Sequence, residues 1–168
     1  MVGRRAGHAT TVVMWALLTG VLILPMVTGC SGQQDPRAYP GTQDRTLDDL
    51  LQRFQLELPP CPTDGLRYYS ASDLSGDLEI RFGTSEDCLE RYLDLLSGGR
   101  GRQKNPPTVL PGDTVGISPV LIKKLNWPID PHKEYDTYAA RPHRELSLNI
   151  VVDRNGPQPV VYILAIRA

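Results

Sequence analysis

Cys30, Cys61 and Cys88 are the residues with the widest choice of chemistry in this 168-residue sequence. A cysteine thiol can be acylated, oxidised to a disulfide, used as a nucleophile or bound to a metal ion as a thiolate. The compartment decides between these, because structural disulfides persist in exported proteins and are rare in the cytosol. The segment that precedes Cys30 indicates the compartment.

The first 29 residues have the three zones of a secretory signal peptide. The segment begins with the basic pair Arg4-Arg5, continues with an apolar run at about residues 12–27, and ends with the small residues Thr28-Gly29. A helix over the apolar run rises about 24 Å, which is short of the roughly 30 Å hydrocarbon core of a bilayer. Pro25 also disturbs a helix here. We therefore expect a cleaved, secreted-type signal at 1–29 and no permanent membrane-spanning helix.

The four residues Val27-Thr28-Gly29-Cys30 resemble the lipobox that ends the signal peptides of bacterial lipoproteins. The resemblance implies transfer of diacylglycerol to the Cys30 sulfur and cleavage between Gly29 and Cys30. Two or three acyl chains such as palmitate hold a protein stably on a bilayer, since each buried methylene contributes about 0.8 kcal/mol. We expect a lipid anchor on the extracytoplasmic face of the cell membrane and no other cofactor. An ordinary signal followed by a chance cysteine is the alternative.

With the first cysteine acylated, Cys61 and Cys88 remain as an even pair, which favours a disulfide in an exported domain. Cys61 precedes one strand-like run and Cys88 follows the next, and the start of one strand neighbours the end of the other in an antiparallel hairpin. The loop length predicts a stabilisation of about 3.5 kcal/mol. The alternative is that Cys88 is a reactive thiol at a helix start, which the adjacent Glu86 and Asp87 oppose.

Hydrophobic patterning predicts an α+β fold with an antiparallel sheet of four to five strands. Two hairpins, at about 66–83 and 146–167, alternate apolar and polar residues. The run 160–166 is apolar on both faces, which places it at the centre of the sheet. We expect helices on one face of the sheet, at 47–55, from a Thr84 cap to Leu96, and at 119–126.

The sequence divides into a signal peptide at 1–29, the anchor with a flexible tether at 30–44, and a single domain at 45–168. We expect a loop at 97–117 and an irregular stretch at 127–144. Removing the signal leaves 139 residues, enough for one domain with a core, and changes the net charge from −1 to −3. This charge gives no reason to expect nucleic acid as a partner, and we expect a monomer.

The mature domain is also similar to small lipoproteins of actinomycetes that have no assigned function. The similarity lies in the runs 66–69, 78–82, 88–93, 127–130, 151–153 and 160–162. These motifs are structural rather than catalytic. The resemblance therefore implies export and an anchored domain, without an activity.

Two sets of side chains are candidates for a binding surface. The first set consists of basic residues in the glycine-rich loop: Arg100, Arg102 and Lys104. The second set consists of aromatic residues that follow this loop: Trp127, Tyr135 and Tyr138. The basic set suits phosphate or anionic lipid headgroups, or is simply solvated. The aromatic set forms a recognition surface if exposed, whereas Trp127 alternatively packs at the edge of the core.

Two histidines among carboxylates are the remaining candidates for chemistry: His132 and His143, with Asp130, Glu134 and Asp136. Their spacing matches neither a helix-borne metal-ligand pair nor a calcium loop. We expect a non-catalytic module that binds an envelope protein or a small molecule through residues 97–144, with no metal. The alternative is an extracytoplasmic enzyme with a site in residues 127–144.

Overall fold

The computed structural model describes residues 35–43, 45–71, 77–98, 103–109, 117–130 and 132–167. The chain divides into two units, 1–31 and 32–168, and every described residue lies in the second. The expected signal peptide and Cys30 lie outside the described residues. No helix in the described part is both long and apolar enough to cross a membrane.

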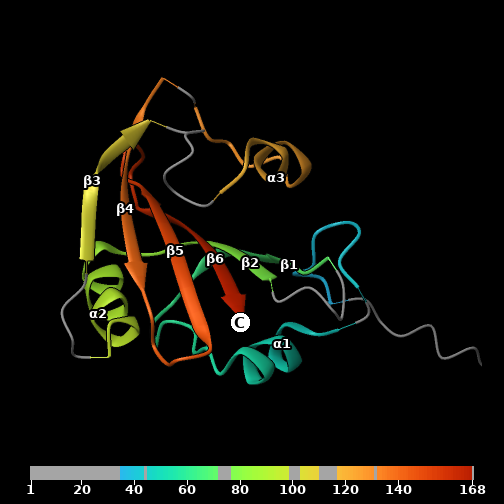
Figure 1. The fold of residues 1–168 in the computed structure, drawn as a ribbon. Helices are drawn as coiled ribbons and strands as arrows, with labels where there is room; N and C mark the ends of the chain where they lie inside the picture. Colours follow the sequence, from blue (N-terminus) through green and yellow to red (C-terminus); the bar gives the residue numbers. More distant parts are fainter. Residues whose placement is uncertain are drawn as a thin grey trace, which may run out of the picture. The chain divides into compact units, whose positions relative to one another are not determined.

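The described residues form three helices and six strands (Figure 1). In chain order they are α1 (Leu47–Phe54), β1 (Asp64–Tyr69), β2 (Asp77–Gly83), α2 (Glu86–Leu96), β3 (Gln103–Val109), α3 (Pro119–Lys124), β4 (Glu134–Ala140), β5 (Leu146–Asp153) and β6 (Val160–Arg167).

The strands form one open sheet in the order β1-β2-β6-β5-β4-β3, and every neighbouring pair is antiparallel. The α+β class is confirmed, and the two predicted hairpins are β1-β2 and β5-β6. β6 lies in the middle of the order, between β2 and β5, as expected from its apolar character on both faces. By this order β2 and β3 run parallel, so α2 lies on the crossover connection that parallel strands require.

β3 and β4 occupy segments that we expected to be a loop and an irregular stretch, so the sheet has more strands than the four to five expected. Pro106 and Pro107 lie where the pairing of β3 with β4 shifts register. Proline has no N–H for the ladder and is therefore confined to edge strands and bulges. β3 is such an edge strand, which explains why a proline pair that argues against a central strand is compatible with this one.

Two core clusters lie on opposite faces of the sheet. α1 and α2 pack on the face that carries Ile80, Ile150 and Ile163. The other face carries Tyr162 and Leu164, and there α3 and the residues after it form the cover. Figure 1 shows α3 well apart from α1 and α2. Helices thus cover both faces rather than one, because β6 presents apolar side chains to both.

Residues 35–43 pack along β1, which corrects the expected flexible tether up to residue 44. The Tyr39 N–H donates to the Tyr68 carbonyl at 2.8 Å, and the Tyr68 N–H donates to the Arg37 carbonyl at 3.0 Å. Asp35 pairs with Arg37 at 2.8 Å, and this bond holds the pKa of Asp35 well below its usual range. Polar composition concealed this backbone pairing. The rest of the expected tether lies outside the described residues.

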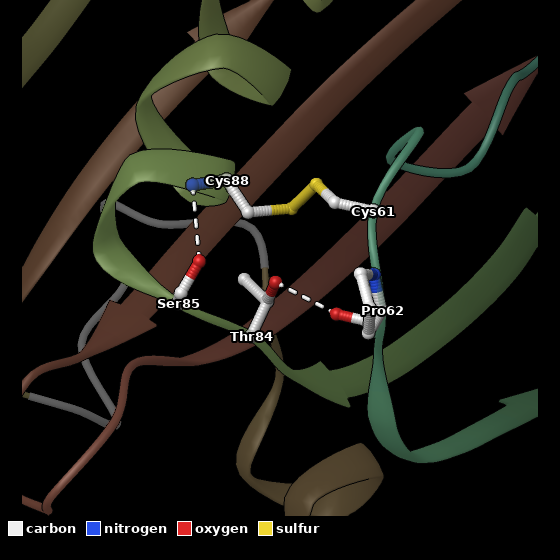
Figure 2. The surroundings of a disulfide bond; sticks show 5 residues. All are labelled: Cys61, Pro62, Thr84, Ser85 and Cys88. Atoms are coloured by element: carbon white, nitrogen blue, oxygen red, sulfur yellow. Dashed lines mark hydrogen bonds between the residues drawn. A yellow bond between two sulfur atoms is a disulfide. The ribbon is translucent and has the colours of Figure 1, made fainter.

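The disulfide joins Cys61, before β1, to Cys88 in the first turn of α2 (Figure 2). The two Cα atoms are 6.2 Å apart, which is within the range that a disulfide spans. Ser85 caps α2 by accepting the Cys88 N–H at 3.3 Å. Thr84, which we expected to be the cap, instead donates to the Pro62 carbonyl at 3.1 Å. The start of α2 is therefore tied twice to the segment that leads into β1.

Replacing both cysteines, with Cys61→Ser and Cys88→Ser together, is expected to lower the free energy of unfolding by about 3.5 kcal/mol, since the unfolded chain gains the freedom of the loop. Urea unfolding of the oxidised proteins measures this difference. Reduced wild type is the control and should unfold close to the double variant. Coincident unfolding curves for the double variant and the oxidised wild type would contradict the prediction.

Candidate functional site

The residues expected to form an aromatic binding surface are buried and separated. Trp127 and Tyr135 are 4% and 1% exposed and belong to the core cluster beneath α3. Tyr138 is 4% exposed and belongs to the cluster on the opposite face. The alternative position for Trp127, packed in the core, is the one found. Arg100 and Arg102 lie outside the described residues.

Of the histidines and carboxylates at residues 130–143, the backbone N–H of His132 donates to Asp130 Oδ1 at 2.9 Å, whereas His143 and Asp136 have other partners. His143 Nε2 lies 3.1 Å from the Phe54 carbonyl, at the end of α1. His132 is exposed. Asp136, on β4, pairs with Arg154. Within the described ranges, no group of three or more His, Cys, Asp or Glu residues could hold a metal ion. These positions therefore do not assemble the active site considered as an alternative.

Arg154 is a partly buried cation that pairs with three carboxylates. It pairs with Glu86 at 2.7 Å, with Glu90 at 3.1 Å and with Asp136. The bond to Glu86 is the chief reason that the pKa of Arg154 is raised above its usual value. A hollow of about 340 Å³ lies beside it. Because these pairs join α2 to β4 and to the end of β5, Arg154 has a structural role.

A larger cleft, of about 590 Å³, lies on the face of the sheet that α3 covers. β1, β2, the segment 35–43 and the end of α3 contribute its walls, which consist of Tyr39, Pro40, Arg67, Arg81, Lys124, Leu125, Asn126 and Pro128. Of these described wall residues, three are cations and none is a Ser, Cys, His, Asp or Glu. The walls thus offer positive charge and hydrogen-bond donors, which suits the binding of a negatively charged group.

Arg67 and Arg81 are register partners on neighbouring antiparallel strands and so lie directly opposite each other. Like charges in this position destabilise a sheet. Arg67 Nη2 donates to the Ala38 carbonyl at 3.0 Å. The Nε atoms of both arginines are buried without a hydrogen-bond partner. In the described part of the chain, neither guanidinium group makes an ion pair.

Tyrosine rings fix the positions of these cations. Arg67 Cζ lies 4.9 Å from the ring centre of Tyr39, Arg81 Cζ 5.9 Å from that of Tyr162, and Lys124 Nζ 4.4 Å from that of Tyr69. Such contacts favour a cation over the face of the ring. The Tyr39 hydroxyl accepts from Trp127 Nε1 at 3.2 Å, which holds its ring in place. Burial raises the pKa of Tyr162, and the neighbouring Arg81 opposes this shift.

Glu79 is a buried carboxyl group on the same face of β2 as Arg81. It is 5% exposed, and its Oε2 has no hydrogen-bond partner. Burial, with a smaller effect of the Asp77 charge, raises the pKa of Glu79 to about 7, while the Lys124 charge opposes the shift. The carboxyl group is therefore partly protonated near neutral pH, beneath α3.

Sequence patterns gave no signal for this cleft. Arg67 and Arg81 occupy the polar positions of two alternating strands, which usually face solvent. No protein-family model, curated protein or solved structure matches the chain. Functional inference therefore depends on the cleft and on the amino-terminal sequence.

Glu79→Gln is expected to remove a pH dependence of stability. In the unfolded chain this carboxyl ionises near its ordinary pKa of 4.5, whereas in the folded domain it keeps its proton to about pH 7. The wild type therefore loses about 3 kcal/mol of stability as the pH rises between these values. Urea unfolding at pH 4.5 and pH 8 measures this loss, which the variant should lack.

Glu134→Gln is the matched control, because Glu134 is exposed on the same sheet. It should keep the pH dependence of the wild type. Equal pH dependence in the two variants would show that Glu79 titrates as an ordinary carboxyl.

Proposed function

We propose that this chain is a lipid-anchored binding protein of the extracytoplasmic face of the cell membrane, and that its ligand binds in the cleft beneath α3. The anchoring part of the proposal is supported by the signal-like segment 1–29 and by Val27-Thr28-Gly29-Cys30. The Cys61–Cys88 disulfide supports export, because such bonds persist outside the cytosol.

The cleft is the observation that carries the binding role. Its volume of about 590 Å³ lies within the usual range of small-molecule sites, about 300–1,000 Å³. Three cations converge on it from β1, β2 and α3, and tyrosine rings orient them. The described walls carry hydrogen-bond donors and three positive charges, which favours a binding site for a negatively charged ligand.

The anchor would keep this site near the membrane. Only five peptide links separate Cys30 from Asp35, where the folded domain already begins. Whatever their conformation, five residues span at most about 18 Å. A protein anchored through Cys30 therefore carries its domain close to the lipid headgroups.

Cys30→Ala is expected to abolish incorporation of labelled palmitate into the chain in its bacterial host, because the acceptor sulfur is gone. Globomycin, which blocks the lipoprotein signal peptidase, should make the uncleaved wild-type chain accumulate. The chain with Cys61→Ser and Cys88→Ser is the matched control and should keep its lipid label. Persistent labelling of the Cys30→Ala chain would overturn the anchoring proposal.

A further inference from the structure

We propose that the cleft binds a phosphate group, which the guanidinium groups of Arg67 and Arg81 hold together with Lys124. This inference rests on the proposed binding role of the cleft and names the chemistry of its ligand. It does not depend on the lipid anchor.

The arginine pair is the first argument. Arg67 and Arg81 face each other across β1 and β2, where two like charges repel and destabilise the hairpin. Their Nε atoms are buried and unpartnered, and in the described residues no carboxylate pairs with either side chain. An anion between the two guanidinium groups would remove the repulsion. Arg154, by contrast, has acidic partners of its own.

The orientation of the arginines is the second argument. Arg67 Cζ lies over the ring of Tyr39 and Arg81 Cζ over the ring of Tyr162. Such contacts favour these positions of the two cations, but they do not replace hydrogen bonds at the edges of the guanidinium groups. Those edges are the part of a guanidinium that binds the oxygens of an oxyanion in bidentate fashion. The rings therefore orient the arginines for a ligand without substituting for one.

Charge selects phosphate over a carboxylate. Three cations line the cleft, and a phosphate monoester carries about −1.5 to −2 at pH 7, whereas a carboxylate carries −1. Lys124 also sits in the last turn of α3, a position that suits a cation in any helix. The case therefore depends on the arginine pair, and Lys124 adds to it. Glu79 is not among the described wall residues.

Inorganic phosphate is the probe, titrated into the full chain purified in a maltoside detergent that contains no phosphate. Isothermal calorimetry should show saturable binding, and phosphate should raise the melting temperature. Arg67→Gln and Arg81→Gln are each expected to weaken binding about tenfold or more. Arg91→Gln is the matched control, since Arg91 is exposed on α2, and should bind as the wild type does.

Arg67→Lys distinguishes a loss of phosphate binding caused by the missing guanidinium group from one caused by misfolding. Lysine keeps the positive charge and the stem of the side chain, but it lacks the planar fork, so binding should weaken severalfold in a folded protein. Absence of any phosphate binding tighter than about 10 mM would overturn the proposal. Equal binding by the wild type and both Gln variants would overturn it as well.

Competition experiments with bound phosphate identify the class of molecule that supplies the phosphate group. Displacement by dihexanoyl phosphatidic acid, whose headgroup is a phosphate monoester, below its micelle concentration would assign a lipid headgroup as the ligand. Displacement by glycerol 3-phosphate alone would assign a soluble phosphate ester. The Cys30→Ala chain should bind phosphate as the wild type does. A chain that carries lipid but binds no phosphate would therefore contradict this inference and leave the anchor proposal standing.

Discussion

The burial of β6 on both of its faces is the constraint on which the rest of the domain depends. Val161 and Ile163 point to one face of the sheet and Tyr162 and Leu164 to the other, and all four are buried. Each face must then be covered, because exposed apolar area costs about 25 cal/mol per Å². α1 and α2 cover one face. α3 has only six residues and rises about 9 Å, so by itself it covers part of the other, and the cleft lies at its end.

The arginines of the domain show two different uses of the same side chain. Arg154 is surrounded by acids from α2 and β4, and its interactions join separate elements. Removing one partner of such a partly buried, hydrogen-bonded ion pair is destabilising, because it leaves the other charge unmatched. Arg67 and Arg81 face each other instead, and the Cζ atom of each lies over the ring of a tyrosine. A fold selected only for stability has no need of this pair, since apolar residues at the same positions would avoid the repulsion.

The features that the sequence predicted correctly are local ones. Alternating residues identified the β1-β2 and β5-β6 hairpins, and the cysteines beside the first hairpin identified the disulfide. The features it missed depend on pairing between distant segments. β3 carries Pro106-Pro107, which only an edge position tolerates. The segment 35–43 joins β1 through backbone bonds that leave no side-chain pattern. The cleft requires the register that sets Arg67 opposite Arg81, and alternation alone does not determine register.

If the chain is anchored through Cys30 as proposed, proximity to a membrane changes the affinity that the cleft needs for its ligand. Tyr39 in the cleft wall is nine residues from Cys30 and therefore at most about 32 Å from it along the chain. Under the proposed anchoring, a site this close to a bilayer would meet headgroup phosphates at a high effective concentration, since short flexible links give values in the millimolar range. A weak phosphate site would then be occupied by lipid, whereas a soluble phosphate ester present at micromolar levels would require a much tighter one. The affinity of the cleft for phosphate thus distinguishes a domain that docks on its own membrane from one that captures a dissolved ligand.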